Sequence, residues 1–250
     1  MLVKTQVKYI QSLGQKKFRD ATNQFVAEGS KIINELLVSP NVETTALFAT
    51  ASWIARHGTE IGSLPNDIVH EIKESTFNSI SQLKTPGEVL GVFKKPEFGG
   101  IDVRKSICLM LDEIQDPGNL GSIIRTADWF HIQKIFCSKG CADAFNPKVI
   151  QASMGSIARV EVIVGDLESL LNEFHDVPAY AAVLEGANIF QLEPIDSGFI
   201  IIGNESKGIR SELLGRRIEK ITIPGGGHAE SLNAAIAAGI FMALLVGRSQ

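Results

Sequence analysis

Several short segments in the second part of the chain are apolar throughout, and each is followed by a stretch with helical spacing. Ile107–Leu111 and Phe199–Gly203 are two examples. A strand that is apolar on both faces has to be covered on both faces, which is how strands lie in a parallel sheet. The alternation of such strands with helices therefore predicts an α/β fold with a mostly parallel sheet.

The expected elements fall into two groups. The first contains a basic helical segment within the first twenty residues, strands at Phe25–Glu28, Thr45–Ala49 and Val89–Lys95, and helices at Ser30–Val38 and Ser52–His57. The second has strands at Ile107–Leu111, Lys134–Ser138, Val160–Val164, Tyr180–Leu184, Phe199–Gly203 and Ile221–Pro224. Its helices are expected at Leu120–Phe130, Lys148–Ile157, Leu167–Phe174, a short stretch ending at Arg217, and Ser231–Val246.

A cluster of proline and glycine separates the two groups. Pro96-Glu97-Phe98-Gly99-Gly100 follows a strand pattern and precedes the second regular pattern. Such clusters mark turns and connections. We therefore expect a small α/β domain over residues 1–98 and a larger domain over residues 101–250.

The formal net charge of −4 gives the chain no global positive field that would attract nucleic acid. Any RNA-binding surface must be local, and the basic residues Lys16, Lys17 and Arg19 near the N-terminus are the candidates. Composition alone favours a solvated helix face here, and a phosphate-contacting surface is the functional alternative.

Three cysteines, Cys108, Cys137 and Cys141, are present, an odd number without the spacing of a usual zinc knuckle. We interpret them as reduced structural thiols of a cytoplasmic protein and expect no metal. The first residues have no apolar core typical of a signal peptide. The apolar stretch Leu232–Gly247 is too short to span a bilayer and is expected to be a buried helix.

Three polar, glycine-containing segments follow predicted strands. They are Asp112–Gly121, which leads into a helix carrying Arg125, then Gly203–Gly208, and Pro224–Asn233. Ligands of open α/β sheets bind outside the carboxyl ends of the strands. Each segment alone also fits a helix cap, a tight turn or a plain connection. Together they predict an active site at one edge of the sheet.

Several common chemistries lack their motifs. The chain has no G-x-x-x-x-G-K-[ST] phosphate loop, no G-x-G-x-x-G after its first strand, and no G-x-S-x-G nucleophile turn. His228 has no evident metal or triad partner, so we interpret it as a loop or substrate-contacting residue.

The order and spacing of the polar residues resemble the three motifs of the SpoU branch of the SPOUT RNA methyltransferases. The matching segments are Asn119-x-Gly121-x-x-x-Arg125, Gly203-x-Glu205-x-x-Gly208, and Ile223-Pro224 followed by Ser231-Leu232-Asn233-x-Ala235. The resemblance spans residues 107–250. Less specifically, Phe25–Gly29 and Thr85–Val92 resemble a ribosomal-protein-like RNA-binding domain often fused in front.

The resemblance implies a methyltransferase that uses S-adenosylmethionine to methylate a ribose 2′-hydroxyl of RNA. It also implies a homodimer and a C-terminal trefoil knot that threads the segment after the last strand. The methyl-donor pocket would lie around Leu184, Gly203, Ile223 and Leu232. The family commonly has a bulkier residue than Gly225 in the last loop, so the run of three glycines here is a departure.

The resemblance also assigns roles to the polar residues. Arg125 would contact the substrate phosphate or ribose and is the family's proposed base, but a guanidinium stays protonated in water, which favours the positioning role. Asn119 would orient the ribose or Arg125, and Glu205 would hold Arg125 or its loop. Ser231 and Asn233 would donate or accept hydrogen bonds in the active site.

Several alternatives remain open at this stage. Ribosomal RNA is favoured over transfer RNA, because an extra N-terminal domain often supplies the reach to such a substrate. A second alternative is an RNA-binding protein that keeps the fold without turnover. A third is a related enzyme that methylates a base instead of a ribose.

Overall fold

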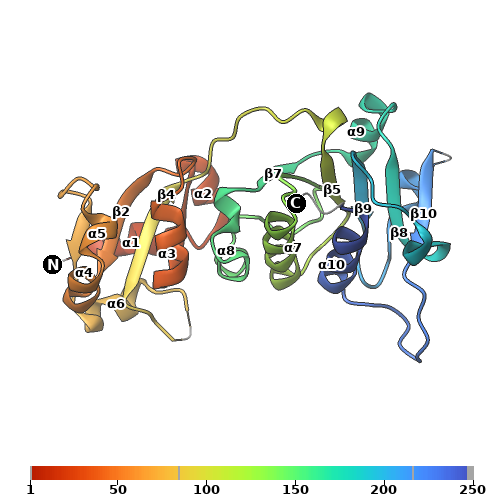
Figure 1. Ribbon diagram of the computed structural model, residues 1–250. Helices are drawn as coiled ribbons and strands as arrows, with labels where there is room; N and C mark the ends of the chain where they lie inside the picture. The colour runs from red at the N-terminus through yellow and green to blue at the C-terminus, as the bar shows by residue number, and fades with distance from the viewer. Residues whose placement is uncertain (1, 84, 216, 247–250) are drawn as a thin grey trace. The chain divides into compact units, whose positions relative to one another are not determined.

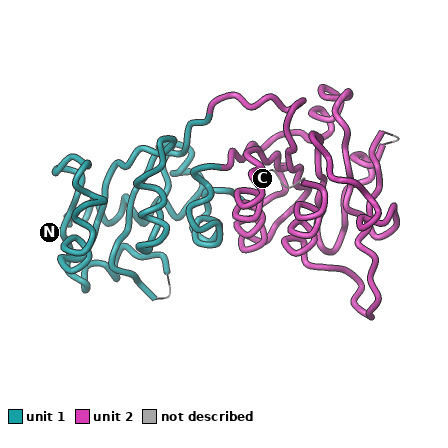
Figure 2. The backbone as a smooth tube through the Cα atoms, in the orientation of Figure 1, with its two compact units in different colours: residues 1–98, 143–159 teal, residues 99–142, 160–250 magenta. Residues whose placement is uncertain are grey.

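The computed structural model describes residues 2–83, 85–215 and 217–246. The chain forms two compact units (Figure 2). Unit 1 contains residues 1–98 and 143–159, and unit 2 contains residues 99–142 and the chain from 160 onward. Residues 143–159 lie inside the second expected domain but pack with unit 1. None of the helices in the described ranges combines the length and apolarity that crossing a bilayer requires.

Unit 1 is built on a four-stranded sheet in the order β1-β4-β2-β3, in which β4 is antiparallel to both of its neighbours (Figure 1). Its strands are β1 (Gln24–Glu28), β2 (Thr44–Ala49), β3 (Val69–Glu71) and β4 (Val89–Lys94). Its helices are α1 (Lys4–Ser12), α2 (Lys16–Thr22), α3 (Ser30–Leu37), α4 (Ala51–Arg56), α5 (Gly58–Ile61), α6 (Glu74–Ile80) and α8 (Pro147–Ser153), with a 3₁₀ turn η2 (Ser156–Ala158).

Two layers of helices cover this sheet. Apolar residues of α1 and α6 pack against alternate residues of the strands, such as Phe48 and Val92, to form one core cluster. The opposite face packs against α3 and α8. The phenyl rings of Phe25 and Phe145 lie 5.3 Å apart, and the side-chain amide of Gln151 donates a 2.9 Å hydrogen bond to the carbonyl of Glu28. These contacts explain why the segment 143–159 packs with unit 1.

Unit 2 is built on a six-stranded sheet in the order β10-β8-β9-β5-β6-β7, and all of its strand pairs are parallel. This confirms the predicted α/β fold with a mostly parallel sheet. The strands are β5 (Ile107–Leu111), β6 (Lys134–Cys137), β7 (Glu161–Val164), β8 (Ala179–Asn188), β9 (Gly198–Ile202) and β10 (Ile218–Thr222). The helices are α7 (Pro117–Trp129), α9 (Leu167–Glu173) and α10 (Ala234–Leu245), with 3₁₀ turns η1 (Val103–Lys105), η3 (Ile189–Gln191) and η4 (Ser211–Leu213).

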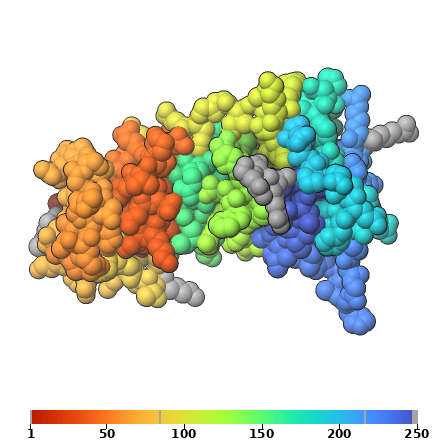
Figure 3. Space-filling model, viewed as in Figure 1, coloured from red at the N-terminus to blue at the C-terminus, as the bar shows by residue number. Residues whose placement is uncertain are grey.

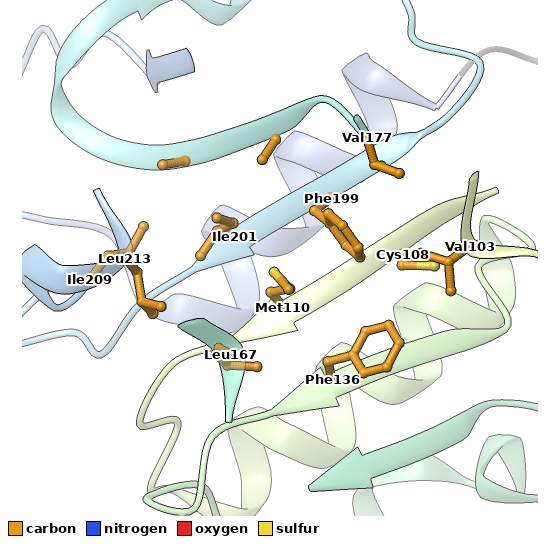
Figure 4. Close-up of a cluster of buried hydrophobic side chains, with 12 residues drawn as sticks. Val103, Cys108, Met110, Phe136, Leu167, Val177, Phe199, Ile201, Ile209 and Leu213 are labelled. Atoms are coloured by element: carbon orange, nitrogen blue, oxygen red, sulfur yellow. The ribbon is translucent and has the colours of Figure 1, made fainter. Parts of the chain in front are cut away.

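The core of unit 2 follows from the apolar strands. On one face, residues of β5 and β9 such as Met110 and Phe199 pack with Leu167 of α9 and Leu213 of η4 (Figure 4). The ring of Phe136 meets that of Phe199 edge-on at 6.1 Å. On the other face, α7 and α10 lie side by side and contact each other (Figure 1). The central strands β5, β6 and β9 are thus buried on both faces, as their apolar composition requires.

Several expected element bounds differ from the structure, and two of the differences have a clear local reason. The helix predicted over 148–157 ends at Ser153, because Met154 and Gly155 adopt left-handed backbone with φ of 51° and 93°. In the described part of the stretch before Arg217, the short η4 is the only helical element. The last strand covers 218–222 instead of 221–224. The last helix begins at Ala234 instead of Ser231, because Asn233 caps it.

Arg19 corrects another expectation. Its side chain is only 2 % exposed, and its guanidinium donates hydrogen bonds to the carboxylate of Asp143 and, at 2.7 Å, to the carbonyl of Leu13. A side chain held in this way cannot reach a phosphate on the surface. The prediction that Arg19 contacts RNA is therefore wrong: its charge instead joins two parts of unit 1 that are distant in sequence.

Replacing Arg19 by Ala should destabilise unit 1 by about 3 kcal/mol, because it leaves Asp143 without its cation and removes buried packing. Urea unfolding monitored by Trp53 fluorescence in a Trp129→Phe background reports on unit 1, since Trp53 is buried there. Lys17→Ala is the matched control, because Lys17 is exposed and its loss should change stability by less than about 0.5 kcal/mol. Equal unfolding midpoints for the two variants would contradict the structural role of Arg19.

Candidate active site

The three polar loops lie at one edge of the unit 2 sheet. The first follows β5 and leads into α7, the second follows β9, and the third follows β10 and leads into α10. Because the strands are parallel, their carboxyl ends share an edge. The connection from 223 to 233 is mostly exposed and projects from the surface (Figures 1 and 3).

Asn119, Glu205 and Asn233, one from each loop, meet through their side chains. The amide nitrogen of Asn119 donates to Glu205 Oε1. The amide nitrogen of Asn233 donates to Asn119 Oδ1 at 2.9 Å and to Glu205 Oε1 at 3.4 Å. We call this set the carboxamide–carboxylate cluster. It brings together three of the five predicted catalytic residues, which are up to 114 residues apart in sequence.

The backbone at the start of α10 completes the cluster. The Ala234 N–H donates to Glu205 Oε1 at 3.4 Å. Asn233 Oδ1 accepts from the N–H groups of Ala235 and Ile236 at 3.0 and 3.3 Å. An N-cap of this kind satisfies amides that the first turn leaves unpaired, and a carboxylate near a helix N-terminus is favoured by the helix dipole. Asn233 is therefore both the cap of α10 and a member of the cluster.

The loop that carries Glu205 is a tight turn that demands glycine at both ends. Asn204 and Gly208 exchange backbone hydrogen bonds of 3.1 and 2.9 Å, and Gly208 has φ of 70°. A Cβ on Gly203 would lie 2.4 Å from the carbonyl carbon of Gly208. Asn204 Oδ1 accepts from the N–H groups of Ser206 and Lys207, which closes the turn.

Asp112 anchors the far end of that loop. Its side chain is fully buried directly after β5, and its carboxylate accepts from the backbone N–H of Arg210 at 3.0 Å and from Nε at 2.9 Å. Burial lowers the pKa of Arg210, but the hydrogen bond to Asp112 and the negative charges of Asp112, Glu113 and Glu212 together raise that pKa above its ordinary value. The Arg210 guanidinium therefore stays charged at neutral pH. The segment between Gly203 and Arg210 is fixed at both ends.

Glu113 links the first loop to the second. Its backbone carbonyl accepts a 2.9 Å hydrogen bond from the Asn204 amide, and its carboxylate lies 3.2 Å from Lys207 Nζ. Its φ is 55°, which is a strained conformation for a residue with a Cβ. Such strain persists only where surrounding contacts impose it, and it is commonly found at functional sites.

The thiol of Cys141 supports the same first loop. It accepts from the N–H of Ile114 at 3.3 Å and donates to the carbonyl of Leu111 at 3.2 Å. Hydrogen bonding with Cys137 lowers the pKa of Cys141 to about 7, and burial opposes that shift. The three cysteines are free thiols, and the described part of the chain contains no group of three or more His, Cys, Asp or Glu suited to a metal ion.

Arg125 and Ser231, the other two predicted catalytic residues, are not part of the cluster. Arg125 is exposed on α7 and forms no hydrogen bond or ion pair with the residues that the structure describes. It lies six residues after Asn119, a spacing that turns it about 120° around the helix from that residue. Ser231 is exposed in the connection before α10. No residue in the described part of the chain therefore competes with an external ligand for the Arg125 guanidinium.

Of the four predicted donor-binding positions, one lies within a strand, two directly follow strands and one lies before α10. Leu184 lies in β8 and is 75 % exposed, and its carbonyl accepts a 2.9 Å hydrogen bond from Thr222 at the end of β10. Gly203 directly follows β9, and Ile223 directly follows β10. Leu232 is 42 % exposed beside the cap residue of α10. Because β10, β8 and β9 are adjacent, these positions share one part of the edge.

Of the predicted RNA-contacting residues, Lys16 and Lys17 are exposed at the start of α2 in unit 1. Lys17 Nζ lies 4.8 Å from the centre of the Phe18 ring. Neither ammonium group is paired with a carboxylate among the described residues. Lys16 and Lys17 therefore remain candidates for an RNA contact, whereas Arg19 does not.

Sequence analysis assigned no role to Asp112, Asn204 or Arg210. The signal for Asp112 was its position directly after an apolar strand, at the edge of the sheet where functional residues gather. The signal for Asn204 was its place between two glycines, where a side chain that closes a turn is favoured. Nothing in the sequence indicated that Arg210 would be the partner of Asp112.

Comparison with known proteins places both parts of the chain. Residues 106–243 match the model of the SpoU rRNA Methylase family, and residues 4–91 match the MRM3-like substrate binding domain. The chain is 32 % identical over 249 residues to the Bacillus subtilis 23S rRNA (guanosine(2553)-2′-O)-methyltransferase RlmP, covering 96 % of each chain.

Solved structures agree with these matches. A Porphyromonas gingivalis protein assigned to the TrmH family of RNA methyltransferases is 36 % identical, with a TM-score of 0.87 and all of both chains covered. An S-adenosylmethionine-bound rRNA methyltransferase from Sinorhizobium meliloti is 29 % identical, with a TM-score of 0.82, covering 97 % of this chain and 94 % of that one. The family model covers more than half of the sequence and includes the carboxamide–carboxylate cluster, so this chain belongs to the SpoU rRNA methylase family.

Proposed function

We propose that this protein transfers a methyl group from S-adenosylmethionine to a ribose 2′-hydroxyl of ribosomal RNA. The observation that carries the proposal is the carboxamide–carboxylate cluster, which joins three loops of a SpoU methylase domain at the carboxyl edge of its sheet. The full-length relative from Bacillus subtilis bears the name of a 23S rRNA 2′-O-methyltransferase. A substrate-binding domain match over residues 4–91 supports a large RNA substrate.

The residues around the sheet edge fit the methyl donor. Leu184 and Leu232 expose apolar side chains there, which suits the flat face of an adenine ring. The backbone near Gly203, Ile223 and Leu232 would hold the adenine and methionine portions. When bound, S-adenosylmethionine supplies an electrophilic methyl group on a sulfonium. The chain's own task is then to position the acceptor hydroxyl and keep it in line.

Arg125 positions the substrate in this proposal. Its guanidinium is exposed and uncommitted within the described residues, and it presents a fork of donors that matches phosphate geometry. The side-chain amides of Asn119 and Asn233 form hydrogen bonds with Glu205 and with each other. The cluster therefore fixes the start of α7 and the start of α10. Glu205 therefore fixes the positions of its own loop and of the starts of α7 and α10, and it does not bind Arg125.

The methylated product distinguishes ribosomal RNA from transfer RNA as the substrate. It also distinguishes methylation of a ribose from methylation of a base. The full chain is incubated with donor labelled in its methyl group and with separate rRNA and tRNA fractions, and the RNA is digested to nucleosides. We expect the label in rRNA, on 2′-O-methylated nucleosides. Arg125→Ala should lower the rate at least about 100-fold, as expected when a positioned group is lost.

Stability provides the control for Arg125→Ala. Replacing an exposed residue that has no hydrogen-bond or ion-pair partner among the described residues should change the free energy of unfolding by less than about 0.5 kcal/mol. Arg125→Lys keeps the charge but loses the fork, and it should recover only part of the rate. Label on a base, or full activity of Arg125→Ala, would refute the proposal.

Exchanging the carboxylate and the carboxamide between Asn119 and Glu205 tests whether their contact matters for activity. Asn119→Asp places a second carboxylate against Glu205, and the repulsion should lower kcat/KM at least about 10-fold. The double variant Asn119→Asp/Glu205→Gln restores a donor and an acceptor in reversed positions, so we expect most of the loss to be regained. Steady-state methyl transfer measures both. A double variant no more active than Asn119→Asp would show that the contact between these side chains does not matter.

We further propose that the protein is a homodimer with a trefoil-knotted C-terminal domain, acting in the cytoplasm, where bacterial ribosomal RNA is found. Trp129 on α7 is 84 % exposed and Ile236 on α10 is 56 % exposed, and such apolar side chains favour a protein interface. The threading of residues 223–233 is expected from the family, and tracing the chain in a crystal structure tests it.

Sedimentation equilibrium tests the dimer. The wild-type chain should have twice the mass of one chain, and Trp129→Glu should shift it to one chain by placing a charge in the interface. Val38→Glu is the control, because Val38 is an equally exposed apolar residue in unit 1. A wild-type protein that stays monomeric at all concentrations would contradict the dimer.

A further inference from the structure

Unit 1 contains a pocket that the catalytic site does not use. Helices α1 and α6 cover most of one face of its sheet, but the part near the start of β2 is left partly open. A pocket of about 240 Å³ lies there, between α1 and the strands. Its walls include Gln6, Tyr9, Gln24, Thr45, Ala46 and His70.

An irregularity in β2 shapes the pocket. Thr44 pairs with Phe93 of β4, but Ala46 pairs with the adjacent Val92, so Thr45 is an extra residue in the strand. A bulge of this kind redirects side chains, and bulges are frequent beside binding sites. Thr45 and Ala46 consequently both line the pocket, and the small side chain of Ala46 leaves the space unfilled.

The pocket offers an aromatic surface. The imidazole of His70 stacks on the ring of Phe48, with centroids 4.9 Å apart and an angle of 22° between the planes. Tyr9 is 40 % exposed beside them. Flat π-systems bind well on such faces, and unpaired RNA bases stack on histidine, phenylalanine and tyrosine in this way.

Uncommitted amide donors surround the aromatic surface. The Tyr9 hydroxyl donates to Gln24 Oε1, and Gln6 Oε1 accepts from the N–H of Val3. The amide nitrogens of Gln6 and Gln24 have no hydrogen-bond acceptor among the residues that the structure describes. Both glutamines thus keep NH₂ groups for an acceptor on a ligand, and the edge of a nucleobase carries such acceptors.

The charge of the residues that line the pocket indicates which class of ligand the pocket binds. None of the residues that line the pocket is acidic or carries a permanent positive charge, so the interior suits a neutral ring and not a phosphate. Lys4 and Lys8 are exposed on α1 outside it, and neither forms an ion pair among the described residues. A base inside and its phosphates outside match this distribution.

The volume of the pocket also favours a single neutral ring as the ligand. At about 240 Å³ it is smaller than the roughly 300–1,000 Å³ of sites for drug-sized ligands. A single ring system fits it better than a complete dinucleotide or cofactor. We propose that this pocket binds one unpaired nucleobase of the RNA substrate. The inference rests on the proposed function for the presence of RNA, but on unit 1 alone for the site.

Two ring-stacked histidines make a direct test. His70 lines the pocket, whereas His57 stacks on Trp53 at 4.1 Å in the same unit and does not line it. The histidine ring protons of the full chain are followed by NMR while each of the four ribonucleosides, their 5′-monophosphates or inorganic phosphate is added. We expect nucleosides and nucleotides to shift the His70 signal saturably and leave His57 unchanged. Phosphate alone should leave both unchanged.

Filling the pocket tests its role in RNA binding. Ala46→Leu occupies the space with an apolar side chain, and His70→Ala removes the stacking surface. Each should weaken binding of heptamers of adenosine or uridine to the full chain about 10-fold, the effect of losing one stacked base. His57→Ala is the matched control and should bind like the wild type. Unchanged unfolding midpoints confirm that the variants fold, and His70→Ala keeps the test valid should Ala46→Leu fold poorly.

The outcomes separate this inference from the proposed function. Wild-type heptamer affinity in both pocket variants, or nucleosides that leave His70 unchanged, would overturn the base pocket even if methyl transfer is observed. Base binding lost in both variants supports it even if the wild-type chain transfers no methyl group.

Discussion

One carboxylate oxygen holds the candidate active site together. Glu205 Oε1 accepts from two asparagine side chains and from the first backbone N–H of α10. Because those donors come from the loops after β5 and β10, a single acceptor fixes the position of three loops and two helices. Removing it would leave both carboxamides short of a partner and the start of α10 without its anion.

The sheet makes this convergence possible, and buried charge keeps it rigid. Parallel strands place their carboxyl ends at one edge, so residues far apart in sequence arrive within hydrogen-bond reach. Asp112, fully buried at the end of β5, then fixes Arg210 at the far end of the Glu205 loop. Rigid support of this kind is what a site needs when its main task is to place a hydroxyl in line with a methyl group. Arg125, which has no such support among the described residues, is the group left to meet the substrate.

The two units divide the work of RNA recognition in the proposed function. Unit 2 holds the reacting groups, and unit 1 offers exposed lysines and an aromatic pocket with unused amide donors. The chain as a whole is acidic, so its affinity for RNA has to come from such local features and not from net charge. The burial of Arg19 reduces the positive charge that unit 1 can offer to RNA, because this cation near the N-terminus pairs with Asp143.

The sequence by itself determined the fold class and the chemistry of the edge. Fully apolar strands require cover on both faces, and the resemblance of three motifs to those of the SpoU family predicted Asn119, Glu205 and Asn233 as site residues. Helix ends were less predictable, because the stop at Ser153 depends on two left-handed residues and on packing of the following turn against α3. Only the tertiary structure decided which polar groups pair: Arg19 with Asp143, Arg210 with Asp112, and Glu205 with two amides instead of Arg125. Pairing depends on distances between residues that are remote in sequence, and a local pattern does not contain those distances.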